Sequence, residues 1–433
     1  MILRIDDTDI DRNTDISLQS IYDGLNWLDL GWDEHYRQSE RLALHSKLAW
    51  AILEKGFAYR DFTPAHAGDD DSAERKAAWL FNPGMPDMPA EESARRAAAG
   101  EPFVVRFRVP RGMGRNIRFV DGVYGEQSKS ADDTEDFALL RSSGLPTYHM
   151  ASCADDVDLQ ITNIIRGQDH LSNTFKHVLI FEALGVPAPE FAHLPLLIAP
   201  DGSKLSKRRH GPVVSVTTYR DAGFLPHTYV NFLCLLGWSP KGNREQMTRE
   251  ELVDAFTLGG VNRANAVVNF TEENPIDDKA LWLNSQHLRA WPLDDLTARV
   301  AAVLAAAGLD APTEHAVDVL RSRYATLTDF ATKGRPYFAD DFDLQPESLA
   351  KLDAPQAREL LRELGSRLEA ASEFTETSVE ELVRALAAEK GVKAGVIING
   401  SRAALTGQTA GPSAFAVFVC VGRERAIRRL RNV

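Results

Sequence analysis

Strand patterns are confined to the first half of this chain, and this limits the possible folds more than any other feature. Ile2–Ile5 predicts a short strand that leads into an acidic turn, and residues 16–30 keep the apolar spacing of an amphipathic helix. Residues 159–166 and 194–199 predict further strands, separated by a helix over 174–184. Because strands that alternate with helices form helix-covered sheets, we expect these segments to share one sheet in an α/β domain.

The rest of the chain is predicted to be an insertion and a helical body. Residues 63–100 are rich in Ala, Asp, Pro and Gly, whereas 103–109 alternates as a half-buried strand does, so we interpret this part as an α+β insertion. Strand signals fade beyond Pro212. Helical spacing is found over the following ranges: 219–236, 249–256, 296–307, 316–330, 354–371 and 379–389.

Length and composition exclude several classes of protein. The 433 residues suffice for about three domains, and no apolar run approaches the roughly 20 residues that cross a bilayer. The N-terminus lacks the basic and apolar regions of a secretory signal. Cys153, Cys234 and Cys420 are too far apart in sequence to form a CxxC cluster, so neither a disulfide framework nor a local zinc site is expected. We expect a cytoplasmic protein with no membrane partner.

The charge of the chain restricts how it could bind a nucleic acid. The net charge of −13 would repel a polyanion if it were spread evenly, so only a local basic patch could bind one. One patch is the loop Lys204–Arg209, which follows a turn signal at 200–203. The other is the tail Arg423–Arg431, which has the spacing of a helix with an arginine face. For this tail we prefer a solvated face to phosphate contact, and both remain open.

The basic loop has the chemistry of a phosphate site. Lys204 and Lys207 can approach phosphate as mobile point charges, and Ser206 can donate a hydroxyl hydrogen bond. On composition alone, an exposed cationic loop would be preferred. The flanking sequence changes that preference.

Lys204–Arg208 closely resembles the KMSKS loop of class I aminoacyl-tRNA synthetases, in the form found in glutamyl-tRNA synthetases. Arg4-Ile-Asp-Asp-Thr-Asp9 is similar to that family's Arg-Ile-Glu-Asp-Thr-Asp segment. Other blocks that resemble the family are His193–Ile198, Tyr219–Pro226, Pro146–Ala151, Ile165–Leu171, Asn231–Trp238, Leu281–Asn284 and Arg402–Gly407. They stand in the family's order over nearly the whole chain.

The resemblance implies a glutamate–tRNA ligase. Such an enzyme activates glutamate with ATP to glutamyl-adenylate, releases pyrophosphate and transfers the glutamyl group to tRNA-Glu. The implied fold is a Rossmann-like catalytic domain over 1–58 and 148–211, with an acceptor-end domain inserted at 59–147. A stem-contact region over 212–284 and an α-helical anticodon-binding domain over 285–433 would follow. We expect a monomer.

The resemblance also implies roles for single residues around ATP. Lys207 would contact ATP on its pyrophosphate side, with Lys204 and Ser206 assisting and Arg208 also binding ATP. Mg²⁺ is expected with the nucleotide and would be held mainly by phosphates. Tyr59–Phe62 stands where certain members carry paired cysteines, so we predict no zinc.

Glutamate and the anticodon would be bound elsewhere. Arg166 would clamp a carboxylate of glutamate, for which a guanidinium fork is a natural bidentate partner. Tyr148 would add a hydroxyl to the same pocket, and Asp6 would face the substrate ammonium. Arg323 would read the third anticodon base, although a solvated surface arginine is an equally open interpretation.

The chain departs from the family at its start. The family begins with a strand and a HIGH-type motif that holds ATP, whereas here Met1 stands directly before the next element. We therefore expect an incomplete Rossmann-like sheet and half an ATP site in the chain as written, and favour a start upstream of Met1. The alternative is a synthetase-derived tRNA-binding protein that forms no adenylate. The helical second half argues against a glutaminyl enzyme or a short adenylate-transferring paralogue.

Overall fold

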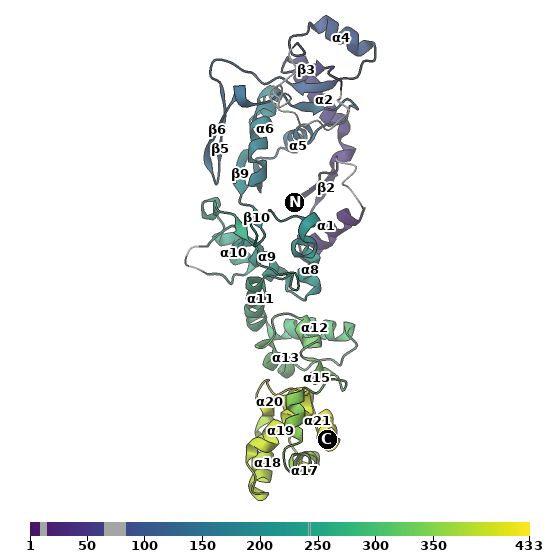
Figure 1. Ribbon diagram of the computed structural model, residues 1–433, viewed down its shortest axis with the longest axis vertical. Helices are drawn as coiled ribbons and strands as arrows, with labels where there is room; N and C mark the ends of the chain where they lie inside the picture. The colour runs from purple at the N-terminus through teal and green to yellow at the C-terminus, as the bar shows by residue number, and fades with distance from the viewer. Residues whose placement is uncertain (9–14, 65–83, 241, 243) are drawn as a thin grey trace. The chain divides into compact units, whose positions relative to one another are not determined.

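The computed structural model describes residues 1–8, 15–64, 84–240, 242 and 244–433 (Figure 1). The chain forms two compact units. The first unit comprises Met1–Leu205, Cys234–Arg244 and Glu250–Val268. The second comprises Ser206–Leu233, Glu245–Arg249 and Asn269–Val433.

The first unit opens with a small parallel sheet. Strand β1 (Ile2–Ile5) pairs in parallel with β2 (Glu34–Arg37), and helix α1 (Asp15–Trp27) lies between them in sequence. Two further helices, the short 3₁₀ turn η2 (Gln38–Glu40) and α2 (Leu42–Glu54), follow β2. The predicted strand and helix at the start of the chain are confirmed.

A four-stranded sheet with the order β6-β5-β9-β8 carries the residues of interest. Strands β8 (Asn163–Gly167) and β9 (Glu190–Leu194) run parallel, joined through η4 (Gln168–His170) and helix α6 (Leu171–Leu184). Strand β5 (Asn116–Asp121) joins β9 through the pair Asp121 and Phe191, and it forms an antiparallel hairpin with β6 (Gly125–Ser130). The hairpin therefore extends the parallel pair.

Two expectations about strands are wrong. The predicted strand over 194–199 is broken, because Pro195 has no N–H for a ladder; β9 ends at Leu194, and β10 (Leu197–Ile198) pairs with β11 (Ala266–Val267). The expected single sheet is not formed either. Within the described residues β1 pairs with β2 alone, and neither joins β8 or β9.

Helices and an antiparallel sheet complete the first unit. Strands β3 (Ala58–Asp61), β4 (Val104–Phe107) and β7 (Ala138–Leu140) form an antiparallel sheet, and α4 (Ala90–Ala98) precedes β4. Helix α5 (Tyr148–Asp158) packs between α2 and α6. The core formed by these elements includes buried Phe107, Leu139, Met150 and Ile180. This core fixes α5 against α6, the helix that follows β8, and both α5 and β8 carry residues of the candidate site.

From Lys207 onward the regular elements of the described chain are helices and one short strand, β11, which agrees with the helical body predicted beyond Pro212. The helices of eight or more residues are α9 (Pro226–Leu235), α11 (Asp278–Ala290), α12 (Leu293–Ala306), α13 (Glu314–Arg321), α17 (Ala357–Ala370), α18 (Glu376–Glu389), α19 (Ala394–Thr406), α20 (Ala414–Val421) and α21 (Arg423–Arg431). The shorter ones are α7 (Lys207–His210), α8 (Val216–Asp221), α10 (Arg249–Ala255), α14 (Thr328–Ala331), α15 (Arg335–Phe338) and α16 (Pro346–Leu352).

Two predicted helices are each divided in two. The pattern over 316–330 is broken, because α13 ends at Arg321 and α14 begins only at Thr328. The pattern over 219–236 is interrupted between α8 and α9 at Gly223, whose φ of +83° favours glycine. A Cβ at this position would lie 2.6 Å from the backbone nitrogen of Thr328, so the close approach also requires glycine. Apolar periodicity continues across the break, because both helices bury one face in the same core.

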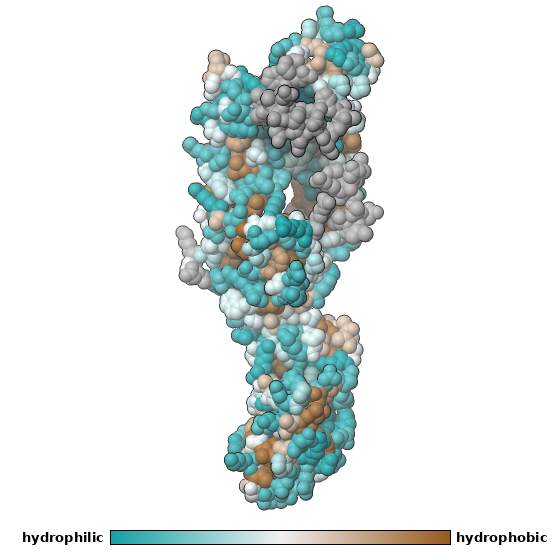
Figure 2. All heavy atoms as spheres, viewed as in Figure 1, coloured by the Kyte–Doolittle hydropathy of each residue, from teal (hydrophilic) through white to brown (hydrophobic). Residues whose placement is uncertain are grey.

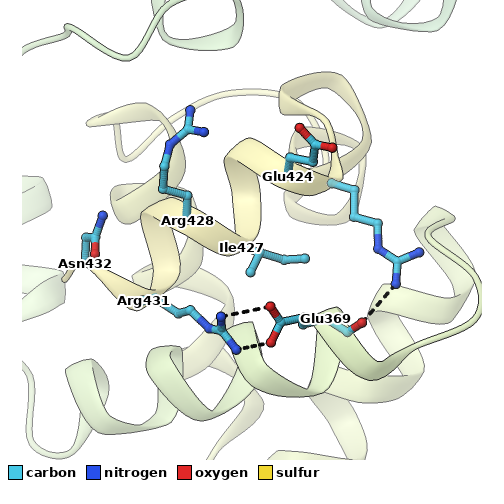
Figure 3. A pocket seen from close by; sticks show the side chains of 7 residues that line it. Glu369, Glu424, Ile427, Arg428, Arg431 and Asn432 are labelled. Carbon is cyan, nitrogen blue, oxygen red and sulfur yellow. Dashed lines mark hydrogen bonds and ion pairs between the residues drawn. The ribbon is translucent and has the colours of Figure 1, made fainter.

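The arginine-rich tail closes the helical unit through contacts within the chain. Arg429 of α21 is 9% exposed and donates to the carbonyl of Pro336 at 2.7 Å. Arg425 donates to the Tyr337 carbonyl at 2.9 Å. Arg431 forms a two-pronged ion pair with Glu369, as Figure 3 shows. Most arginines of this tail thus have partners on neighbouring helices, so a purely solvated face does not describe it, and phosphate contact stays untested.

The outer surface seen in Figure 2 is mostly hydrophilic, with apolar residues in small separate patches. None of the helices in the described part of the chain is both long and apolar enough to span a bilayer.

Candidate functional site

Arg166 in β8 is surrounded by neutral hydrogen-bond acceptors. Its guanidinium donates to Thr174 Oγ1 at 2.8 Å, to Tyr148 Oη at 3.2 Å and to His193 Nε2 at 3.3 Å. Among the described residues no carboxylate lies within ion-pair distance of Arg166. Since the guanidinium is permanently charged, this positive charge remains available to an anionic ligand.

The histidines around Arg166 are neutral at pH 7. Burial lowers the pKa of His193 and of His170, and it lowers the pKa of His149 to about 4. His177 has its pKa lowered well below the usual value, mainly by burial and then by the charge of Arg166. A neutral imidazole can accept a hydrogen bond from the guanidinium, whereas an imidazolium cannot.

Tyr148 and Arg166 are brought together as the sequence predicts. Tyr148 is the first residue of α5, and its hydroxyl also lies 3.0 Å from His170 Nδ1. Burial raises the pKa of Tyr148, so the side chain stays a hydroxyl that can donate to a ligand. The pair forms a half-buried surface with one fixed cation and one hydroxyl.

Asp6 follows β1 and is held by Arg4. The Asp6 carboxylate accepts from Arg4 Nε at 2.8 Å and Nη2 at 3.3 Å, and 42% of its side chain is exposed. Arg4 Nη1 donates in turn to Asp156 Oδ1 of α5 at 2.8 Å. After burial and the charge of Arg166, Asp6 is among the charges that act on the pKa of Tyr148. Asp6 therefore lies in the electrostatic neighbourhood of the Arg166 and Tyr148 pair.

Asp155 braces this part of the first unit from within. It is fully buried and accepts hydrogen bonds from Arg41 at 2.7 Å, His45 at 2.8 Å and Gln38 at 3.0 Å. Burial alone would raise the pKa of Asp155, but these hydrogen bonds hold it below the usual value. The carboxylate thus ties the start of α2 to α5, the helix that presents Tyr148.

The basic loop is described in part. Lys204 donates to Asp169 Oδ2 at 2.6 Å, which joins the loop to the segment after β8. Ser206 caps the short helix α7: its hydroxyl accepts from the Arg209 N–H at 3.4 Å, and its own N–H donates to His210 Nδ1 at 3.2 Å. Lys207 and Arg208 form the first turn of α7, and their side chains lie outside the described part of the structure.

Arg323 lies in the second unit, just after α13. Its side chain is exposed, and it has no ion pair among the described residues. The structure adds Arg402 of α19, which in the sequence is only the first residue of a block that resembles the family. Its Nη1 atom is buried without a hydrogen-bond partner among the described residues. Burial lowers the pKa of Arg402, and the nearby charge of Arg323 lowers it further.

Comparison with known proteins decides the family. Residues 1–273 match the family described as "tRNA synthetases class I (E and Q), catalytic domain", and residues 286–433 match the "Anticodon binding domain". The chain is 55% identical over 436 residues to the glutamate–tRNA ligase of Solibacter usitatus, covering 99% of this chain and 91% of that protein. The chain belongs to the glutamate–tRNA ligase family.

Further relatives agree with this assignment. A glutamate–tRNA ligase of Thermus thermophilus is 38% identical, covering 100% of this chain and 92% of that protein. The crystal structure of a glutamate tRNA ligase from Elizabethkingia meningosepticum in complex with its amino acid superposes with a TM-score of 0.84 at 30% identity. That match covers 100% of this chain and 91% of the solved chain. No comparison supports the tRNA-binding alternative without ligase activity.

The described part of the chain shows no sign of a metal-binding site. No group of three or more His, Cys, Asp or Glu side chains suited to a metal ion occurs among the described residues. The absence of zinc stays a prediction. Class I synthetases use ATP with Mg²⁺, and acidic residues near Arg166 such as Asp169 and Asp6 are already paired with cations.

Proposed function

We propose that the chain activates glutamate with ATP and transfers the glutamyl group to tRNA-Glu. The observation that carries the proposal is the uncompensated guanidinium of Arg166 beside the Tyr148 hydroxyl, in a chain of the glutamate–tRNA ligase family. A substrate with two carboxylates suits this site because one carboxylate can be clamped while the other reacts.

The two carboxylates of glutamate have different roles in the reaction. An oxygen of the α-carboxylate attacks the α-phosphorus of ATP, the bond to the β-phosphate oxygen breaks, and pyrophosphate leaves. A hydroxyl at the 3′ end of the tRNA then attacks the activated carbonyl, and AMP leaves. Because the α-carboxylate must reach phosphorus, Arg166 and Tyr148 are best placed to hold the side-chain carboxylate. Asp6, oriented by Arg4, would face the α-ammonium.

The basic loop is proposed to hold the phosphates of ATP. Lys207, assisted by Lys204, Ser206 and Arg208, would stabilise the negative charge that grows on pyrophosphate as it leaves. Lys204 must release Asp169 to do so, and both side chains are partly exposed. Mg²⁺ would enter with ATP, bound mainly through phosphate oxygens.

The second unit is proposed to bind the anticodon loop. Arg323 is exposed, and its charge acts on the partly buried Arg402 nearby. Guanidinium groups can hydrogen-bond or stack on the unstacked bases of an RNA loop. We also propose that the enzyme works as a monomer in the cytoplasm, a reducing compartment with which its three free cysteines agree.

Exchange of labelled pyrophosphate into ATP tests the proposal directly. Exchange is measured both with and without added tRNA, because the proposal leaves open whether tRNA must bind first. The chain should support exchange that depends on glutamate at least when tRNA is present, and should charge tRNA-Glu. Lys207→Ala should abolish exchange while leaving tRNA affinity unchanged. Lys351→Ala, at an exposed position of α16, is the matched control. A chain that binds tRNA tightly but catalyses neither step would instead establish the tRNA-binding alternative.

A further inference from the structure

Behind Arg166 lies a buried pair formed by Asp121 and His193. His193 Nδ1 is 2.5 Å from Asp121 Oδ2, and both side chains are fully buried. Asp121 is the last residue of β5, whereas His193 lies in β9, so the pair links the hairpin to the parallel strands. Neither residue has a place in the chemistry described above.

The hydrogen bonds around this pair fix the tautomer of His193. Asp121 is ionised, because hydrogen bonds from His193 and from backbone N–H groups outweigh burial and keep the pKa of this carboxyl low. An ionised carboxylate only accepts, so the shared proton is on Nδ1 and Nε2 carries a lone pair. That lone pair faces Arg166 Nε at 3.3 Å and the hydroxyl of Thr174 at 3.1 Å.

The hairpin turn holds the carboxylate in place. Asp121 Oδ1 accepts from the N–H groups of Tyr124 at 2.9 Å and Val123 at 3.0 Å, the last two residues of the turn before β6. It also accepts from the N–H of His193 at 3.3 Å. Asp121 is therefore oriented before any ligand arrives, and this orientation passes through the imidazole to the guanidinium.

This pair orients the guanidinium of Arg166 without neutralising its positive charge. A carboxylate in direct contact with Arg166 would orient it equally well, but would also neutralise it and compete with a substrate carboxylate. A neutral imidazole supplies the same acceptor without a negative charge at the guanidinium. The carboxylates of Asp121, Asp169 and Asp6 are each engaged by another partner, as would be needed to keep Arg166 uncompensated.

We propose that Asp121 and His193 form a positioning dyad, which holds Arg166 through a neutral imidazole and so leaves its charge to the carboxylate of glutamate. This inference rests on the proposed function. It assigns Asp121 and His193 as positioning residues that act through Arg166.

Two variants of equal size test the role of charge. Glutamine and glutamate at position 193 both offer an oxygen acceptor in place of Nε2, but only glutamate adds a negative charge. In His193→Gln, the KM for glutamate in pyrophosphate exchange should stay within about threefold of wild type. In His193→Glu, it should rise more than about tenfold while the KM for ATP stays within about twofold. Thermal unfolding and tRNA binding monitor the fold of both variants.

Equal KM values for glutamate in the two folded variants would overturn the dyad. If His193→Glu does not fold, the Asp121→Asn variant tests the proposal instead, because it removes the charge that fixes the tautomer of His193. We expect the KM for glutamate to rise about fivefold in this variant, and an unchanged KM would overturn the proposal. If the wild-type chain shows no glutamate-dependent exchange even with tRNA present, the proposed function itself is refuted. If the wild-type chain does catalyse exchange but the variants keep its KM for glutamate, only the proposed dyad is refuted.

Discussion

The ammonium of Lys204 lies 2.6 Å from Asp169 Oδ2, so one cation of the basic loop is paired with a carboxylate three residues after Arg166. Both side chains are partly exposed, at 54% for Lys204 and 34% for Asp169. Ion pairs with this exposure are worth about 0–1 kcal/mol. A nucleotide phosphate can therefore displace Asp169 at little cost.

We predict that Lys204→Ala raises the KM for ATP about tenfold, whereas Asp169→Asn changes it by less than about threefold. Pyrophosphate exchange at varied ATP concentration measures both. Gly167→Ala is a third variant for this contact, because its Cβ would lie 2.5 Å from Asp169 Oδ1 and displace the carboxylate. It should behave like Asp169→Asn, and a large loss of exchange in both would show that Asp169 does more than hold Lys204.

The guanidinium fork of Arg166 should matter more than its charge alone. Arg166→Lys keeps the charge but loses the contacts with Thr174 and Tyr148, and we expect exchange to fall about a hundredfold or more in kcat/KM for glutamate. Tyr148→Phe removes one hydroxyl and should cost about three- to tenfold. Tyr22→Phe, whose hydroxyl contacts His35 at the surface, is the control. Wild-type kinetics in Arg166→Lys would remove this residue from the site.

Asp155 should be one of the largest single contributors to stability in the first unit. Asp155→Ala leaves Arg41 and His45 without their buried acceptor, and we expect a loss of about 3–5 kcal/mol in the free energy of unfolding by urea. Asp158→Asn weakens only the exposed contact of Arg41 and should cost less than about 1 kcal/mol. Similar losses in the two variants would contradict a bracing role for the buried carboxylate.

The pH dependence of stability follows from the histidines around Arg166. The pKa of His149 is about 4 in the folded protein, below the usual 6.5, so the unfolded chain binds more protons between these values. Stability is therefore full above about pH 6.5 and falls as the pH drops towards 4, by up to about 1.4 kcal/mol per pH unit for this proton. His177, whose pKa is lowered well below the usual value, adds to the slope.

Urea unfolding at several pH values between 4 and 7 measures this slope. His149→Phe should reduce it, because the variant has one titrating group fewer and keeps an aromatic ring beside Phe137. A stability that does not change over this pH range would contradict the neutral state of the cluster.

The arginine-rich helix α21 should act on stability rather than on RNA binding. Arg429→Met removes the donor for the buried carbonyl of Pro336, and we expect the thermal midpoint of the helical unit to fall with a loss of about 2–3 kcal/mol. Arg431→Ala removes an exposed pair with Glu369 and should cost under about 1 kcal/mol. Neither change should weaken tRNA binding, and a large loss of tRNA affinity in Arg431→Ala would instead assign this face to the RNA.

Local pattern predicts most of the elements but little of their pairing. Ile2–Ile5 is a strand with the predicted bounds, and the helical spacing over 379–389 lies within α18. Pairing between strands depends on contacts between distant segments. The partner of β1 and the break at Pro195 therefore appear only in the structure.

The same limit applies to the site. Short motifs identify Arg166 and Tyr148, and the structure brings them together at 3.2 Å. The residues behind them are harder to find, because Asp121 and His193 are 72 positions apart. Asp121 belongs to no motif, and His193 only opens the block His193–Ile198, whose resemblance to the family implies no role for it. Arg402 is hard to find as well, since a buried, unpartnered nitrogen has no signature in the sequence.

The hydrogen bond between Asp121 and His193 limits how this enzyme can be recombined with its relatives. The β5–β6 hairpin looks like a module that could be grafted from one family member to another. Its last residue before the turn, however, sets the proton position in an imidazole on a neighbouring strand. A chimera that replaces residues 116–130 must keep an acceptor at position 121 or change position 193 with it. Positions 121, 193 and 166 should therefore covary as one unit during divergence.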